Sequence, residues 1–99
     1  MDVEYLHQGI VFEWDSGKAA ANLVNHAVSF EAACEVFFDP FVRVSDDLII
    51  GVEVRESIIA MTLGWKVLCV IYTVRVGDRF RIISARQATP TERQLYEGE

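Results

Sequence analysis

The chain has 99 residues, of which 52% are hydrophobic and 24% charged, a composition that predicts one folded domain over residues 1–99 and excludes a disordered segment. A net charge of −6 excludes simple electrostatic coating of nucleic acid. The longest apolar run, residues 67–72, is too short to cross a bilayer, so we expect no membrane contact. The acidic start lacks a signal-peptide pattern, and Cys34 and Cys69 lie in apolar segments, which together indicate free thiols in a reducing cytoplasm.

The charge is unevenly distributed along the chain. Residues 1–65 contain three basic and eleven acidic side chains, whereas residues 66–99 contain six basic and four acidic ones. An acidic body with a basic C-terminal third could bind a short RNA at that third, but it could not coat a duplex.

The first 14 residues contain a weak and a clear indication of β-structure. Residues 1–8 show no clear period, and we interpret them as an N-terminal extension or as a loosely attached first strand. Residues 9–14 alternate apolar and polar side chains, which predicts a strand.

A helix follows this strand. Asp15 or Ser16 can cap it, and the Ala-rich residues 18–25 have high helix propensity. Residues spaced by four lie on one side of a helix, so a polar stripe here could face a site. The stripe consists of Lys18, Asn22 and His26.

A second helix is predicted over residues 30–38, with Ser29 as its N-cap and Asp39-Pro40 as its stop. The connection between the two helices is short and contains Ala27, where glycine would supply a left-handed C-cap at lower cost.

From residue 41 onward the hydrophobic period is that of strands. Turn residues separate the strands at hairpin spacing, so an antiparallel meander is expected. Several of these strands are apolar on both faces, which indicates that helices cover one face and that the other needs cover, for example from a partner. The predicted strands are 41–45, 48–53, 57–63, 66–76 and 79–85.

The last strand carries a basic face and leads into a terminal helix. Arg79 and Arg81 share one face of the extended chain. Residues 89–92 then combine a Thr at the N-cap, a Pro at the first helical position and a Glu that can close a capping box. The fold class predicted from these elements is α+β, with two N-terminal helices packed on a mainly antiparallel sheet and a short C-terminal helix.

The sequence argues against several kinds of chemistry. His7 and His26 are far apart, and no cluster has the spacing of metal ligands, so no metal or other cofactor is expected. The cysteines have apolar neighbours, which disfavours a thiolate nucleophile. Motifs of phosphate loops and nucleophile elbows are absent from the sequence.

Metal-free cleavage of a phosphodiester remains compatible with the sequence. That reaction needs a base for the 2′-OH proton, cations for the charged transition state and an acid for the leaving oxygen. The candidate cations are Arg81, Arg86, Arg55 and Lys18. The candidate bases are His26 and Glu53. The candidates for holding RNA are Lys18, Tyr72, Arg79, Arg93 and Tyr96.

Each candidate also has a purely structural interpretation. The arginines of the last strand can simply keep an exposed sheet face in water, and Lys18 can be a solvated side chain. His26 can cap helix carbonyls, and Glu53 with Arg55 can form a surface ion pair. Tyr72 alternates with apolar residues, so its ring is expected in the core with its hydroxyl at the edge.

The series of short motifs resembles the BrnT family, the toxins of a bacterial type II toxin-antitoxin pair. Each motif is short, but their order along the chain is specific, and together they cover about residues 12–96. The motifs are FEWD at 12–15, KAAANL at 18–23, His26, VSFEAA at 28–33, VF before Asp39-Pro40, Glu53 with Arg55, VIYT at 70–73, and RIISAR at 81–86 followed by AT, ER and Tyr96.

The resemblance implies a RelE-like fold and a metal-independent endoribonuclease that cleaves RNA and inhibits translation. It also implies a BrnA-like antitoxin that neutralises the toxin, contact with operator DNA only through that antitoxin, and a dimer of heterodimers. The sequence departs from the family at two places. Ala27 stands where the family usually has Gly, which strains the helix C-cap or changes the turn. Val24-Asn25 stand where the family often has basic residues, which together with the net charge of −6 points to weakened or lost activity. The alternative function is therefore a non-catalytic antitoxin-binding module, or co-repressor, with the same fold.

Overall fold

The computed structural model describes residues 1–45, 48–50 and 53–98, and it begins with a β-hairpin rather than with helices. Strand β1 (Asp2–His7) pairs antiparallel with β2 (Ile10–Asp15) along its whole length, from Asp2 opposite Asp15 to His7 opposite Ile10. The two turn residues, Gln8 and Gly9, have φ angles of 49° and 81°, as a tight hairpin turn requires. Residues 2–7 thus form an edge strand of the sheet, paired along its whole length, which agrees with the interpretation of this segment as a first strand.

The predicted helix starts are confirmed. The Asp15 side chain accepts a hydrogen bond from the Lys18 N–H and caps α1 (Ser16–His26), and Ser29 caps α2 (Phe30–Glu35) in the same way. Ala27 ends α1 in the left-handed conformation with a φ of 56°. The predicted helix 30–38 is only partly correct, because its last turn tightens into the 3₁₀ helix η1 (Val36–Phe38).

The remaining elements are strands, followed by one helix. They are β3 (Arg43–Val44), β4 (Leu48–Ile50), β5 (Glu53–Met61), β6 (Val67–Arg75), β7 (Arg79–Gln87) and α3 (Pro90–Glu97). The strand predicted over 41–45 is shorter than expected, and the one predicted over 57–63 begins earlier, at Glu53. Part of the strand predicted over 48–53 lies outside the described residues. The capping box of α3 is present as predicted, with Thr89 and Glu92.

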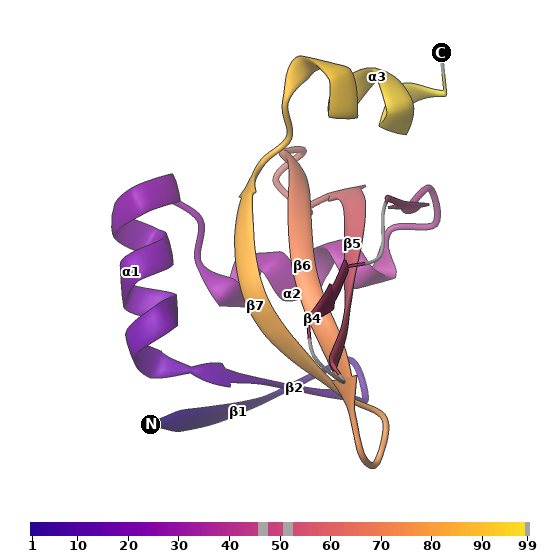
Figure 1. Cartoon of the computed structure of the whole chain (residues 1–99). Helices are drawn as coiled ribbons and strands as arrows, with labels where there is room; N and C mark the ends of the chain where they lie inside the picture. Colours follow the sequence, from indigo (N-terminus) through magenta and orange to yellow (C-terminus); the bar gives the residue numbers. More distant parts are fainter. Residues whose placement is uncertain (46–47, 51–52, 99) are drawn as a thin grey trace.

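The sheet is mainly antiparallel, as predicted, and β5, β6 and β7 form the expected meander. The meander does not extend to β3 and β4, which both pair with β5, and one parallel pair makes the sheet mixed. Its strand order is β1-β2-β7-β6-β5-β3, and β4 also pairs with β5 (Figure 1). Every described pair is antiparallel except β2 with β7, where Phe12 lies opposite Phe80 and Glu13 opposite Arg81. Hairpin spacing could not predict this pair, because a parallel connection can span any number of intervening elements.

The two faces of the sheet pack against different elements. Helix α2 passes behind β6 and β7 in Figure 1, and the larger core lies on this side, around Phe12, Phe30 and Ile82. A smaller cluster of Ile59, Val67 and Cys69 lies on the opposite face, because successive residues of a strand point to opposite sides. Tyr96 of α3 packs on this smaller cluster, so the chain itself supplies some of the cover that was expected from a partner. Among the helices in the described residues, none is long and apolar enough to span a membrane.

Candidate functional site

A β-bulge brings Arg81 and Arg86 onto the same face of the sheet. Five residues apart on a regular strand, they would point to opposite sides. The pairing of β7 with β6 skips Ile83, however, because Ile82 lies opposite Tyr72 whereas Ser84 lies opposite Ile71. The partners of the two arginines, Thr73 and Cys69, therefore share a face, and so do the arginines themselves. This face is opposite the one that α1 and α2 cover.

Arg81 is held between two carboxylates of the N-terminal hairpin. Its Nη1 donates to Oε2 of Glu13 at 2.7 Å, and its Nη2 donates to Oδ1 of Asp2 at 3.1 Å. Only 16% of the Arg81 side chain and 13% of the Glu13 side chain are exposed. The parallel β2–β7 pair creates this contact, because it sets Glu13 directly beside Arg81. The hydrogen bonds that Arg81 donates to Asp2 and Glu13 raise the pKa of Arg81, and the contact with Arg81 lowers the pKa of Asp2.

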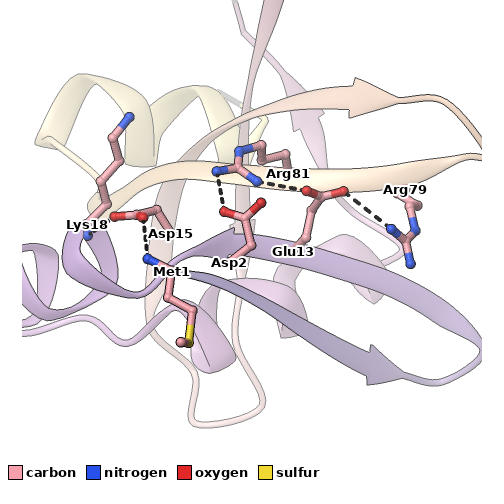
Figure 2. Close-up of polar contacts among 7 residues, drawn as sticks. All are labelled: Met1, Asp2, Glu13, Asp15, Lys18, Arg79 and Arg81. Atoms are coloured by element: carbon pink, nitrogen blue, oxygen red, sulfur yellow. Dashed lines mark hydrogen bonds and ion pairs between the residues drawn. The ribbon is translucent and has the colours of Figure 1, made fainter.

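Arg79 continues the same row of charges. Its guanidinium lies 2.6 Å from Glu4 and 4.0 Å from the second oxygen of Glu13. Figure 2 shows Glu13 between the two arginines, with Asp2 reaching Arg81 from the neighbouring strand. The hairpin thus supplies a carboxylate to each arginine, and the row is close to electrically balanced.

Next to this row of charges, the amino terminus of the chain forms an ion pair with Asp15. The amino group of Met1 lies 3.1 Å from Asp15, whose other oxygen accepts the Lys18 N–H at 3.0 Å (Figure 2). The hydrogen bonds from Lys18 and from the amino terminus lower the pKa of Asp15. Lys18 itself has an exposed side chain, so its ammonium is available to a ligand.

Arg86 has its own carboxylate, from α3. Its Nη1 and Nη2 donate to the two oxygens of Glu92 at 2.7 and 3.0 Å, a bidentate pair. Glu92 also accepts the Thr89 N–H at 2.9 Å as part of the capping box. The Arg86 contact, helped by Thr89, lowers the pKa of Glu92 to about 2, so this carboxylate is charged at neutral pH.

Glu53 and Arg55 form the third pair, with Arg55 Nε 2.9 Å from the carboxylate. The hydrogen bond from Arg55 lowers the pKa of Glu53, and the charges of Arg55, Arg75 and Lys18 act in the same direction. Lys18 of α1 is therefore within electrostatic reach of β5. A hollow of about 400 Å³ opens beside this pair, lined in part by Glu53, Thr73 and Arg75.

The other predicted site residues lie elsewhere. The Tyr72 ring is buried in the main core, where it packs edge-on against Phe37 and Phe80. His26 is exposed in the last turn of α1, on the helix side of the molecule. Tyr96 and Arg93 belong to α3; Arg93 is exposed, whereas the Tyr96 hydroxyl donates to Asp39 at 2.6 Å.

Sequence reasoning missed the carboxylates of the hairpin and the role of Asn22. Glu13 alternates with Phe12 and Trp14, a pattern that assigns it to the face away from the core. Its contact with Arg81 depends on a strand pairing that no local pattern encodes. Asn22 was grouped with Lys18 and His26, yet it is buried. Within the residues that the structure describes, no three His, Cys, Asp or Glu side chains are arranged to hold a metal ion.

The fold and site define a small α+β protein in which arginines of one sheet are paired with carboxylates of the sheet and of α3. A family model described as "Ribonuclease toxin, BrnT, of type II toxin-antitoxin system" matches residues 14–92. The chain belongs to this family of ribonuclease toxins, and membership implies an antitoxin partner.

A solved structure has a similar fold. The 1.1 Å crystal structure of the Brucella abortus ribonuclease toxin BrnT matches with a TM-score of 0.61 and 20% sequence identity, covering 77% of this chain and 92% of that one. At this identity the likeness concerns the fold. Among curated proteins, no relative matches the chain.

Proposed function

We propose that this chain is an endoribonuclease toxin that cleaves RNA without a metal ion and thereby inhibits translation. The observation that carries the proposal is that Arg81 and Arg86 share one face of the sheet, with Arg55 two strands away on β5. Cations fixed on strands are suited to stabilising the charge that develops on a scissile phosphate. A RelE-like fold assignment is part of the same proposal.

The roles of the individual residues follow from their places. Arg81 and Arg86 stabilise the transition state, and Arg55 with Lys18 adds positive charge beside Glu53. Glu53 is the better placed base, because it lies within reach of these cations, whereas His26 lies on the helix side of the molecule. Arg79, Arg93 and Tyr96 are proposed to hold RNA around this centre. The predicted role of Tyr72 in holding RNA is not kept, because its ring is buried in the main core.

Substrate must compete with carboxylates that are already in place. Arg81 and Arg86 lie opposite residues four apart on β6, so their Cα atoms are about 13 Å apart. Their side chains point to Asp2, Glu13 and Glu92, so the two arginines can reach the same phosphate only after they leave these carboxylates. RNA binding therefore requires the phosphate groups to displace at least the more exposed of these carboxylates.

The same pairing favours a second candidate function, a non-catalytic antitoxin-binding co-repressor. Each of the three proposed catalytic arginines forms an ion pair with a carboxylate, Arg81 with Glu13, Arg86 with Glu92 and Arg55 with Glu53. Arginines satisfied in this way can be structural, and a chain that keeps them for its fold need not cleave RNA.

The proposed partner is a BrnA-like antitoxin, with which the chain forms a dimer of heterodimers and reaches operator DNA only indirectly. The place of action is the cytoplasm, where messenger RNA is translated. Co-expression with a candidate antitoxin followed by size-exclusion chromatography tests the complex. A single peak containing both chains is expected, and two separate peaks would count against the partner.

Cleavage of RNA in the presence of a chelator tests the activity. Arg81→Ala and Arg86→Ala should each lower the rate roughly 10²–10³-fold, or about 2.7–4 kcal/mol of transition-state stabilisation, by analogy with loss of one oxyanion-hole donor. Lys66→Ala, which removes an exposed charge in the β5–β6 turn, is the matched control. Thermal unfolding of each variant separates lost chemistry from lost folding. If the wild-type chain binds antitoxin but does not cleave, the co-repressor function replaces the proposal.

A further inference from the structure

The side-chain amide of Asn22 is buried and makes three hydrogen bonds to backbone groups. Its nitrogen donates to the carbonyls of Val28 and Ala85 at 2.9 and 2.8 Å, and its oxygen accepts the Ala85 N–H at 3.2 Å. Only 7% of the residue is exposed. A buried amide with both ends satisfied joins α1, the α1–α2 connection and β7 at one point.

The two bonds to Ala85 replace those of a missing strand. The described pairing of β2 with β7 ends at Arg81, so the edge of β7 beyond that residue has no strand beside it. Helix α1 stands along this stretch instead (Figure 1). An unpaired N–H and C=O at a buried position would be costly, and the amide of Asn22 satisfies both groups of Ala85.

Ala85 lies between the bulge and Arg86. The bulged residue is Ile83, and a bulge weakens the local ladder and bends its strand. The Asn22 contact restrains β7 directly after this bend. The restrained residue is Ala85, which immediately precedes Arg86. Without this restraint, the strand after Ile83 loses the contact that fixes its direction.

We propose that Asn22 is a positioning residue for Arg86. By fixing the backbone at Ala85, Asn22 holds Arg86 on the face that it shares with Arg81. The role in cleavage rests on the proposed function, but the positioning itself does not, because it concerns the placement of one arginine side chain in the folded protein.

Side-chain NMR of the full chain tests the positioning. The Nε–H signals of Arg81 and Arg86 are assigned with Arg81→Lys and Arg86→Lys, and are then compared in wild type, Asn22→Ala and Asn22→Ser. Asn22→Ser is uncharged and keeps a hydroxyl but is too short to make all three bonds of the amide, so it remains informative if Asn22→Ala does not fold. The Arg86 signal should shift and the Arg81 signal should not. An unchanged Arg86 signal in a folded variant overturns the proposal. Asn25→Ala, on the exposed side of the same helix, is the control.

A double-mutant cycle tests the consequence for cleavage. Asn22→Ala should lower kcat by up to about 10²-fold per folded molecule, the size expected when a catalytic group is misplaced by about 1 Å. In an Arg86→Ala background the same substitution should cause no further loss, whereas in an Arg81→Ala background its full effect should remain. A purely structural Asn22 would lower stability equally in all backgrounds and leave these rates unchanged, which contradicts the proposal. If the wild-type chain does not cleave, the proposed function fails, and the NMR result still decides the positioning.

Discussion

Arg86 and Glu92 meet through both of their terminal heteroatoms, at 2.7 and 3.0 Å, although one belongs to the last strand and the other to the last helix. Glu92 at the same time closes the capping box with Thr89. One carboxylate thus starts α3, anchors α3 to the sheet and occupies an arginine that we propose as catalytic. The position of the terminal helix and the availability of this arginine are therefore coupled.

Loss of the Glu92 charge should destabilise the protein in acid. The pKa of Glu92 is lowered from its usual 4.5 to about 2 in the folded chain, so its contribution is fully present above about pH 4.5 and is lost as the pH falls through 2. Glu92→Gln should cost about 1.5–3 kcal/mol at pH 7, the usual range for hydrogen bonds to charged groups. Urea unfolding of both chains between pH 2 and pH 7 should give curves that converge at the acid end. Glu97→Gln, on the exposed side of α3, should leave the curve unchanged.

Removal of the Asp2 charge should strengthen RNA binding. Asp2 is the more exposed of the two carboxylates on Arg81, and Glu13 remains to hold the arginine when Asp2 becomes Asn. Affinity for an uncleavable 2′-O-methyl RNA should rise roughly two- to fivefold at low salt, as the loss of one exposed ion pair allows. Fluorescence anisotropy measures the change. Glu31→Gln removes an exposed charge on α2 and is the control, and equal affinities for both variants would contradict competition at Arg81.

Substitution of alanine by glycine should raise the free energy of unfolding at position 27 and lower it at position 20. Ala27 has a φ of 56°, a conformation that costs a residue with a Cβ about 1–2 kcal/mol. Ala27→Gly removes this strain but adds freedom to the unfolded chain, so a net gain of about 0.5–1 kcal/mol is expected. Ala20→Gly, inside α1, should instead cost about 1 kcal/mol. Thermal unfolding of the two variants should therefore show shifts of opposite sign, and shifts of the same sign would contradict the assigned backbone of α1.

The Tyr96 hydroxyl should ionise only at a pH well above 10 and should stabilise the folded protein as long as it is protonated. Burial and the hydrogen bond to the Asp39 carboxylate raise the pKa of Tyr96 to about 12. Because the folded pKa is above the usual 10, the stability from this group is fully present below pH 10 and is lost as the pH rises through 12. Tyr96→Phe should cost about 1–3 kcal/mol at neutral pH and remove one late step from the tyrosinate absorbance titration. Loss of a step near pH 10, in place of the late one, would mean that the hydroxyl is not held by Asp39.

Features that depend on neighbouring residues could be predicted from the sequence, whereas pairing between distant segments could not. The caps at Asp15, Ser29 and Thr89 could be predicted because each depends on side chains within three residues of the helix start. The α+β class could be predicted for the same reason, since helix and strand periods are local.

The candidate site depends on features without a local signal. No periodicity indicates that β2 inserts beside β7, and this pair alone sets Glu13 beside Arg81. The sequence also contains no local signal for the bulge at Ile83. This bulge nevertheless places Arg86 on the same face of the sheet as Arg81. Asn22 looked like its exposed neighbours Lys18 and His26, because spacing shows which residues share a helix side but not what that side packs against.

The parallel pair also delays completion of the fold during synthesis. Glu13 and Arg81 are separated by 68 positions, so the first hairpin has no strand to join until residues 79–87 have left the ribosome. Contacts of such long sequence separation form slowly, because loop-closure entropy must be overcome before they contribute. A partly made chain consequently carries neither the finished sheet nor its row of paired arginines. In this member of the ribonuclease toxin family, the row of paired arginines therefore forms only after β7 has been made.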